Sequence, residues 1–440
     1  MHKSGGAVGQ RPGFLIKTLG CKVNQFDAAS LARALEDSGL ERTKEGLNPS
    51  LILVQTCTVT SATDKQNRQL IRSLKARHPQ ALIVATGCQA EVFAQSLEAM
   101  PEVDLVWGNQ NKDSLVDQIL ARLGMEGTGV CREELLWGER LAGIPGRTRA
   151  FLKVQDGCNG ACSYCIVPKA RGRSRSRSPA SISRALKLME KAGIQEVVLT
   201  GIHLGSYGRD LEPPTSLLRL LEQVLQECTI PRIRLSSIEP QELEKGLLQL
   251  MAQNKRVCPH LHVPLQSGSG EVLKLMKRPY TKAHYESRIL EAVETVPHLS
   301  LGADVMVGFP GEKEEHFQET LNFLESMPWT YLHVFPFSPR PGTPAHAMGP
   351  KLAPGEMKTR AAVLRDLSRA RRHQAMVSWV GKSISVLLER PSKGRPGWME
   401  GLSHNYFRVV VQGGGELRNT IQKVRVTGTW EGLLTGVVAK

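Results

Sequence analysis

The stretch Asp156-Gly-Cys-Asn-Gly-Ala-Cys-Ser-Tyr-Cys-Ile-Val-Pro168 places Cys158, Cys162 and Cys165 at C-x3-C-x2-C spacing. A [4Fe-4S] cluster normally takes four cysteine ligands. Three closely spaced thiolates without a nearby fourth leave one iron open to bind something other than protein. The spacing therefore predicts a cluster with one open iron, held in a loop of this chain.

A structural zinc site is the alternative interpretation of the same three cysteines. Zinc sites usually combine two C-x2-C or Cys/His pairs to reach four ligands. Neither His203 nor Cys228 stands at a fitting distance from the triplet along the chain. The spacing favours iron and sulfur over zinc.

At this point the chain resembles the radical S-adenosylmethionine superfamily. The resemblance implies that S-adenosylmethionine binds the open iron through its amino and carboxylate groups. An electron from the cluster then splits a carbon–sulfur bond to give a 5′-deoxyadenosyl radical. Tyr164 stands where the superfamily usually has an aromatic ring beside the adenine, and the alternative is a ring that only packs the loop.

Length and composition predict a protein of several domains without a membrane span. The chain has 440 residues, 41% of them hydrophobic, which predicts two to four domains. No apolar segment follows Met1, no run approaches 18 apolar residues, and the nine cysteines show no regular spacing. These features predict a soluble protein of the reducing cytoplasm without a disulfide framework.

Positive charge is abundant and clustered. The formal net charge is +15, and basic residues occupy every second position from 169 to 177. In an extended segment this period would line one face with cations, which suits nucleic acid, although a merely solvated surface is the alternative. The candidate RNA-binding residues are Lys169, Arg171, Arg173, Arg175 and Arg177.

The first segment, residues 11–129, alternates apolar runs with helix-like stretches, which is typical of a parallel α/β sheet. The runs are residues 14–16, 51–54, 82–85 and 103–107. Cys21, Cys57 and Cys88 each follow one of the first three runs. Because the loops after parallel strands meet at the carboxyl edge of a sheet, we predict a second group of three cysteines there. Three unrelated small apolar cysteines are the alternative.

The middle segment, residues 144–374, contains six apolar runs separated by helical stretches. The runs are residues 151–154, 197–199, 233–235, 261–263, 305–307 and 332–334. Six βα units predict an incomplete (β/α)6 barrel with its chemistry at the carboxyl ends of the strands. Polar and glycine-containing loops at those ends supply five further candidate cofactor-binding residues beside Tyr164: Gly201, His203, Ser237, Glu239 and Gln266.

The last segment, residues 375–440, changes to short β-rich runs separated by turn signals. The runs are residues 383–388, 406–411, 423–426 and 433–438. They predict a small closed β-barrel. From Met376 onward nine basic residues stand against four acidic ones, which favours RNA binding over a purely stabilising cap.

Over nearly its full length the chain resembles the radical S-adenosylmethionine methylthiotransferase family. The matching strings are Thr18-Leu-Gly-Cys-Lys-Val-Asn-Gln25, Thr56-Cys-Thr-Val-Thr60, Thr86-Gly-Cys88, Gly157-Cys-Asn-Gly-Ala-Cys-Ser-Tyr-Cys165, Arg171-Gly-Arg-Ser-Arg-Ser-Arg177 and Pro264-Leu-Gln-Ser-Gly-Ser269. The resemblance implies cluster ligands at Cys21, Cys57 and Cys88 as well as at the central triplet, and a C-terminal TRAM domain.

Within that family the chain is most similar to the branch that acts on N6-threonylcarbamoyladenosine in tRNA. The strings Leu19-Gly-Cys-Lys-Val-Asn-Gln25 and Leu199-Thr-Gly-Ile-His-Leu-Gly-Ser-Tyr-Gly208 carry this similarity. Gln55 and Gln89 depart from the residues usual at their positions. The alternatives are the branches that modify isopentenyladenosine in tRNA or an aspartate of ribosomal protein S12.

The reaction that the resemblance implies uses two [4Fe-4S] clusters and S-adenosylmethionine. The radical removes hydrogen from carbon 2 of the adenine beside the anticodon, and a methylated sulfide on the N-terminal cluster supplies the methylthio group. The partners implied are the tRNA anticodon arm, an electron donor such as flavodoxin or ferredoxin, and a sulfur source. Cys131, Cys228 and Cys258 match no ligand position. An RNA-binding iron–sulfur redox sensor without catalysis is the rival of another class.

Overall fold

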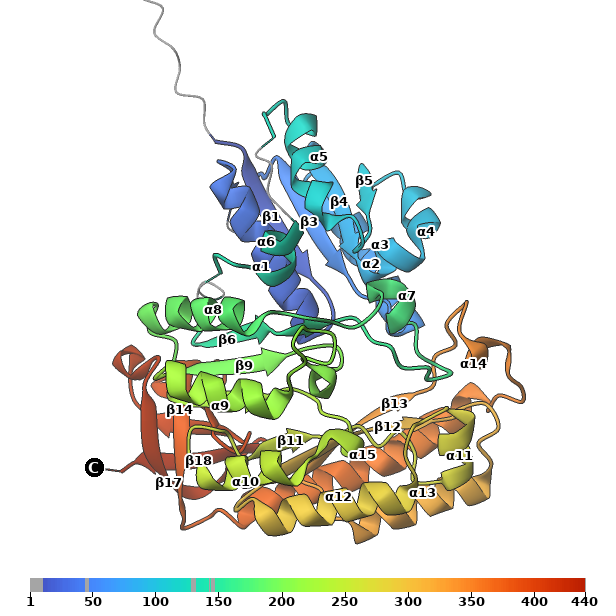
Figure 1. Cartoon of the computed structure of the whole chain (residues 1–440), viewed down its shortest axis with the longest axis vertical. Coiled ribbons are helices and arrows are strands. Elements are labelled where there is room, and N and C mark those ends of the chain that lie inside the picture. The colour runs from blue at the N-terminus through green and yellow to red at the C-terminus, as the bar shows by residue number, and fades with distance from the viewer. Residues whose placement is uncertain (1–10, 44–46, 128–131, 142, 144–146, 440) are drawn as a thin grey trace, which may run out of the picture. The chain divides into compact units, whose positions relative to one another are not determined.

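The computed structural model describes residues 11–43, 47–127, 132–141, 143 and 147–439 (Figure 1). Cys131 lies outside these residues. The chain divides into two compact units. The N-terminal unit comprises residues 1–141 and 166–172, and the C-terminal unit comprises residues 142–165 and 173–440.

A parallel sheet forms the centre of the N-terminal unit, with its described strands in the order β2-β1-β3-β4-β5. The strands are β1 (Gly13–Thr18), β2 (Glu41–Arg42), β3 (Leu51–Thr56), β4 (Leu82–Gly87) and β5 (Leu105–Trp107). The helices are α1 (Lys22–Asp37), α2 (Ser61–Arg77), α3 (Cys88–Val92), α4 (Ala94–Glu98), α5 (Leu115–Arg122), α6 (Arg132–Trp137) and α7 (Val167–Arg171). The four predicted runs are strands, and the two-residue β2 was not predicted.

Helices cover both faces of this sheet. Successive side chains of a strand point to opposite faces, so one strand contributes to two apolar cores. Leu51 and Leu53 pack in one apolar core with residues of α1, α5 and α6. Ile52 and Val54 pack in a second core with residues of α2, α3 and α4. This explains why the β3 sequence is continuously apolar rather than alternating.

Two three-stranded parallel sheets carry the central part of the C-terminal unit, in the orders β10-β9-β6 and β11-β12-β13. The six predicted runs form β6 (Arg149–Lys153), β9 (Glu196–Thr200), β10 (Arg232–Leu235), β11 (His260–His262), β12 (Ser300–Val307) and β13 (Tyr331–Pro336). Isolated parallel bridges, Ile233 with Val257 and Ser237 with His262, connect the two sheets. The predicted succession of parallel βα units is therefore confirmed.

Helices follow these strands as the βα pattern requires. They are α8 (Pro179–Lys191), α9 (Leu217–Glu227), α10 (Lys245–Gln253), α11 (Gly270–Leu275), α12 (Lys282–Thr295), α13 (Glu314–Ser326), α14 (Pro344–Ala347) and α15 (Pro354–Val377). The long α15 runs along β13 (Figure 1). A short antiparallel pair, β7 (Gln155–Asp156) and β8 (Arg175–Ser176), flanks the cysteine loop. None of the helices in the described ranges combines the length and apolar character that a bilayer crossing requires.

The C-terminal segment is β-rich, and its strands close into a barrel in the order β14-β15-β16-β18-β17. The strands are β14 (Ser383–Pro391), β15 (Trp398–Ser403), β16 (Arg408–Gln412), β17 (Ile421–Trp430) and β18 (Leu433–Val438). The sequence did not predict β15, whose centre holds Glu400 and Gly401. Gly401 is needed there, because a Cβ atom would lie 2.4 Å from the carbonyl oxygen of Leu387 on the paired strand.

Buried arginines join the C-terminal barrel to the amino ends of the parallel strands. Arg234 on β10 donates to both carboxylate oxygens of Glu196 on β9, at 2.7 and 3.1 Å, and to the backbone oxygens of Ser403 and His404. Arg232 donates to the backbone oxygen of Leu402 at 3.0 Å. The Arg234 and Glu196 side chains are 1% and 0% exposed, so this contact is fully desolvated.

Replacing Arg234 with alanine is expected to destabilise the protein by about 3–5 kcal/mol, because Glu196 keeps a buried charge without its bidentate partner. The barrel also loses two hydrogen bonds to its backbone. Urea unfolding followed by circular dichroism measures the effect. Arg369→Ala is the control, since Arg369 is 75% exposed in its pair with Asp366 and should change stability by less than about 1 kcal/mol. Equal effects of the two substitutions would contradict this account of the junction.

Candidate cluster and cofactor sites

The central cysteine triplet lies in a loop that its neighbours hold firmly. The loop begins with Asp156, whose Oδ1 accepts from the amide of Gly157 at 2.8 Å while its Oδ2 pairs with Lys153 at 3.0 Å. Gly157 has φ +74°, a conformation that favours glycine. Inside the loop, Ser163 binds the backbone oxygens of Leu275 and Met276. The triplet therefore belongs to a fixed piece of backbone at the end of the first parallel strand.

Cys158 contacts a histidine that sequence spacing did not connect with it. The Sγ of Cys158 lies 3.8 Å from Nδ1 of His203, whose Nε2 lies 2.8 Å from a carboxylate oxygen of Glu242. Although burial opposes ionisation, His203 and the Gly160 amide together lower the pKa of Cys158. Burial lowers the pKa of His203, but its contacts with Cys158 and Glu242 raise it to about 10. The separation of His203 from Cys158 along the sequence did not predict this contact. His203 follows the carboxyl end of β9, which lies beside the cysteine loop.

Arg278 lies beside Cys162. Its guanidinium donates to Cys162 Sγ at 3.3 Å and to the Tyr280 hydroxyl at 3.1 Å, and it pairs with Glu239. Only 4% of the Arg278 side chain is exposed. Although burial opposes the charged form, the neighbouring Tyr164, Tyr280 and Glu239 raise the pKa of Arg278. A buried, permanently charged guanidinium thus faces the triplet.

Tyr164 has an apolar environment, and Gln266 has an unusual backbone conformation and a buried acceptor. Tyr164 lies against an apolar group that includes Phe309, with ring centroids 6.5 Å apart. Gln266 is buried at φ +68°, and among the described residues its Oε1 has no hydrogen-bond partner. A strained backbone with an unsatisfied buried acceptor is typical of a ligand site.

Ser237, Glu239 and Gly201, the remaining candidate cofactor residues, have different surroundings. Ser237 is exposed next to the bridge with His262, and Glu239 pairs with Arg278. Gly201 is explained by packing, since a Cβ there would lie 2.8 Å from Oε1 of Gln155. All of them lie just beyond the carboxyl ends of β9, β10 and β11, together with Gln266 and His203.

The N-terminal unit brings Cys21, Cys57 and Cys88 to neighbouring loop positions. Cys21 directly precedes α1, Cys57 directly follows β3, and Cys88 begins α3. The approach is close: a Cβ on Gly20, at φ +101°, would lie 2.7 Å from Cβ of Cys57. Burial, together with the neighbouring Cys88 and Cys21, raises the pKa of Cys57 to about 12 against the opposing effects of the Val59 backbone and Arg171. The three thiols therefore share one electrostatic environment.

Polar side chains surround this second cysteine group. Asn109 donates its side-chain amide to Cys88 Sγ at 3.8 Å, and the Cys88 thiol faces the acceptor Oδ1 of Asn24 at 3.8 Å. Arg171 donates to Asn24 at 2.6 Å and pairs with Asp27 at 3.0 Å. A set of three thiols beside the Asn109 amide donor and a buried cation fits an anionic iron–sulfur cluster better than a plain apolar packing role.

The expected cationic face from residue 169 to 177 is not what the structure shows. Residues 167–171 form the helix α7, and Gly172 turns the chain at φ +76°. Arg171 and Arg177 are buried, at 4% and 0% exposure. Lys169 and Arg173 are exposed and Arg175 is partly exposed. The predicted cationic face is therefore wrong for Arg171 and Arg177. Alternating basic residues share one face only in an extended segment, and here a helix and a turn direct their side chains differently.

Sequence reasoning missed Arg278, Glu242 and Asn109, which lie far along the chain from the cysteines they approach. It also missed His262, Asp304 and His333, which meet across three neighbouring strands. The only signal for the latter was polar residues inside otherwise apolar runs, since β-strand alternation places such residues on one face.

Comparisons with known proteins agree with this architecture. Residues 152–324 match the Radical SAM superfamily, and residues 13–108 match Uncharacterized protein family UPF0004. A radical S-adenosylmethionine methyltransferase from Kitasatospora setae shares the fold at TM-score 0.55 and 17% identity, covering 77% of this chain and 75% of that one.

Curated relatives extend over almost the whole chain. "Threonylcarbamoyladenosine tRNA methylthiotransferase MtaB" of Aquifex aeolicus is 37% identical, covering 92% of this chain and 98% of the relative. The protein of the same name from Bacillus subtilis is 34% identical, covering 93% and 92%. A "tRNA-2-methylthio-N(6)-dimethylallyladenosine synthase" of Pelotomaculum thermopropionicum is 32% identical, covering 97% of each. The chain therefore belongs to the radical S-adenosylmethionine methylthiotransferase family.

Proposed function

We propose that this enzyme converts N6-threonylcarbamoyladenosine beside the tRNA anticodon to its 2-methylthio derivative. The observation that carries the proposal is the pair of three-cysteine groups, one in each unit, each at the carboxyl ends of parallel strands. The names of the relatives from Aquifex aeolicus and Bacillus subtilis supply the substrate. A redox sensor without catalysis has no need of two such groups.

The ligands in this proposal are Cys158, Cys162 and Cys165 for one [4Fe-4S] cluster and Cys21, Cys57 and Cys88 for a second. A cluster held by the first three thiolates would supply the electron for cleavage of S-adenosylmethionine, and a cluster held by the second three would offer an open iron for the transferred sulfur. Tyr164, Gly201, His203, Ser237, Glu239 and Gln266 are the proposed S-adenosylmethionine neighbours, with the unsatisfied Gln266 Oε1 as the group that most needs a ligand.

Arg278 has a positioning role in this arrangement. Its guanidinium holds Cys162 on one side and Glu239 on the other. It therefore fixes a cluster ligand relative to a cofactor residue. Its positive charge, largely shielded from water, also favours the more negative, reduced state of a cluster at the triplet.

Replacing Arg278 with glutamine is expected to lower the midpoint potential of the central cluster and to slow S-adenosylmethionine cleavage by about 10- to 100-fold. The midpoint potential is read from a redox titration monitored by electron paramagnetic resonance. Arg288→Ala is the control, because Arg288 pairs with Glu291 on α12 and contacts no cysteine in the described structure. An unchanged potential together with an unchanged cleavage rate in Arg278→Gln would refute the role.

The tRNA is proposed to contact the exposed cations near the cysteine loop and the C-terminal barrel. We infer three functional regions, residues 11–129, an incomplete (β/α)6 radical S-adenosylmethionine barrel over 144–374, and a TRAM-like RNA-binding domain over 375–440. The closed five-stranded topology of the last region supports this inference. Among the basic residues from 169 to 177, Lys169, Arg173 and Arg175 remain the candidate phosphate ligands.

Replacing Arg173 and Arg175 together with alanine is expected to weaken tRNA binding and to flatten its dependence on salt. Two lost phosphate contacts reduce the slope of log K against log salt by roughly 1.4–1.8. Filter binding of tRNA between low and moderate salt measures this slope. Arg219→Ala, which removes an exposed arginine on α9, should leave the slope unchanged. A slope equal to that of the unaltered protein in the double variant would remove these two residues from the interface.

The electron donor is proposed to be a flavodoxin- or ferredoxin-like protein, and a separate source must supply sulfide, because neither electrons nor sulfur come from the tRNA. The site of action is the cytoplasm, where tRNA is modified. Reconstituted enzyme supplied with tRNA carrying either N6-threonylcarbamoyladenosine or isopentenyladenosine tests the substrate. We expect methylthiolation of the first only; modification of the isopentenyl substrate, or of S12 alone, would overturn the proposal.

A further inference from the structure

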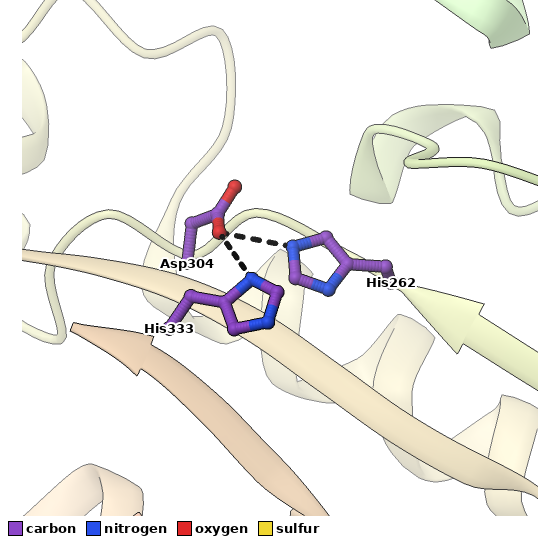
Figure 2. A group of neighbouring side chains, drawn as sticks. All are labelled: His262, Asp304 and His333. Carbon is purple, nitrogen blue, oxygen red and sulfur yellow. Dashed lines mark ion pairs between the residues drawn. The ribbon is translucent and has the colours of Figure 1, made fainter. Parts of the chain in front are cut away.

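A compact group of metal-binding side chains lies on β11, β12 and β13, apart from the cysteines. Figure 2 shows His262 and His333 both directed at Asp304. Nε2 of His262 lies 3.0 Å, and Nδ1 of His333 3.3 Å, from the same carboxylate oxygen, Oδ1 of Asp304. Parallel register creates this meeting: β12 pairs Asp304 with His333 and pairs Gly302, two residues earlier on the same face, with His262.

We propose that His262, Asp304 and His333 bind one divalent transition-metal ion. Two imidazoles and one carboxylate form the donor set of mononuclear zinc and non-haem iron sites. Ligands about 2.0–2.2 Å from an ion, at angles between octahedral and tetrahedral, lie roughly 2.8–3.6 Å from one another. The two distances to Asp304 Oδ1 fall within this range, and all three ligand atoms lie within 4.8 Å of one another.

A second layer of contacts orients His262 for this role. Its Nδ1 lies 3.2 Å from the hydroxyl of Tyr331, which lies 2.9 Å from Nε2 of His260. The His260 ring stacks on Tyr406 at a centroid distance of 4.1 Å. Metal-binding histidines usually engage their other ring nitrogen in this way, which fixes the nitrogen that faces the ion. The Tyr331 contact thus leaves Nε2 of His262 for the metal.

One side of the group is open to solvent. The His333 side chain is 61% exposed, whereas His262 is 8% exposed. An ion held here would keep positions open toward solvent. Water would fill them, as it fills the open position of zinc sites that have three protein ligands.

The group lies next to the candidate cofactor residues. The backbone N–H of Gln266 donates to the backbone oxygen of Asp304 at 2.8 Å, and Ser237 forms a parallel bridge with His262. Two of the candidate cofactor residues, Gln266 and Ser237, are therefore backbone neighbours of the proposed metal ligands.

The rival explanation is a hydrogen-bonded cluster in which Asp304 simply accepts from two imidazoles. His316 and Glu271 provide a matched control, because their contact of 3.1 Å is a histidine–carboxylate pair of the same unit without a third donor among the described residues. Asp304→Asn separates the two explanations, since the amide keeps the size and an acceptor oxygen but loses the charge that a metal needs.

The experiment uses holoenzyme with its cysteines occupied by reconstituted iron and sulfide. The protein is equilibrated with Zn²⁺, freed of unbound ion by gel filtration, and analysed for zinc and iron. We expect about one zinc per chain in the unaltered protein and in His316→Ala. In Asp304→Asn and His333→Ala we expect at least a tenfold loss of bound zinc at unchanged iron. His333→Ala, at an exposed position, serves if Asp304→Asn fails to fold.

X-ray absorption at the zinc edge identifies the ligands, and nitrogen and oxygen neighbours are expected. Sulfur neighbours, equal zinc in all four proteins, or no zinc in the unaltered protein would each overturn the proposal. The readout is metal content rather than methylthiolation. A failure of the substrate assignment therefore leaves the zinc result intact, and the reverse is also true.

Discussion

Replacing Cys158, Cys162 and Cys165 together with alanine is expected to abolish cleavage of S-adenosylmethionine and to halve the iron content. Anaerobically reconstituted protein should hold about eight irons, and the triple variant about four. The physical reason is that the loop supplies all the thiolates of one site and the N-terminal unit supplies the others. Iron analysis and chromatographic detection of 5′-deoxyadenosine measure the two effects.

The matched control is Cys228→Ala, which removes a buried cysteine held by Arg256 rather than by another thiol. It should leave both the iron content and 5′-deoxyadenosine formation unchanged. A triple variant that keeps about eight irons would show that the ligands are wrongly assigned. One that keeps its S-adenosylmethionine cleavage would show that the radical arises elsewhere.

Replacing Cys21, Cys57 and Cys88 together with alanine is expected to separate the two halves of the reaction. The central loop is intact in this variant, so S-adenosylmethionine cleavage persists at a comparable rate. Methylthiolated nucleoside should fall to background, because the proposed sulfur-carrying iron has lost its ligands. The measurement compares 5′-deoxyadenosine with methylthiolated product in the same reaction.

Cys57 and Cys88 are buried, so folding of this variant must be established by circular dichroism and by retention of the central cluster. The corresponding serine variant keeps the side-chain size if the alanine variant is unstable. Methylthiolated product formed at the normal rate by a folded variant would exclude the N-terminal cysteines from sulfur transfer.

The parallel strands were predictable because the apolar pattern of a short segment is enough to identify a buried strand. A continuously apolar run such as that of β3 requires a sheet covered on both faces. The positions of Cys21, Cys57 and Cys88 follow from the same pattern, since each comes within three residues of the end of a strand. The strand β15 escaped prediction because Gly401, placed there for close approach to Leu387, interrupts the apolar signal.

Contacts between distant segments were not predictable from the sequence. Arg278 reaches Cys162 across 116 residues, and His203 reaches Cys158 across 45. For the basic residues from 169 to 177 the sequence predicted too much. Their regular spacing suggested one exposed face, but Arg171 and Arg177 are buried. Helix α7 buries Arg171 against Asp27 instead. Which way a charged side chain points depends on the turn that precedes it and on the partner it finds.

The most direct test of the proposed function is nucleoside mass spectrometry of tRNA from cells that lack this protein, with and without the gene restored. We predict that the 2-methylthio form of N6-threonylcarbamoyladenosine disappears in the deletion and returns with the restored gene, but not with a gene that encodes alanine at Cys158, Cys162 and Cys165. Unchanged levels of that nucleoside in the deletion would contradict the assignment and turn attention to isopentenyladenosine and the S12 aspartate.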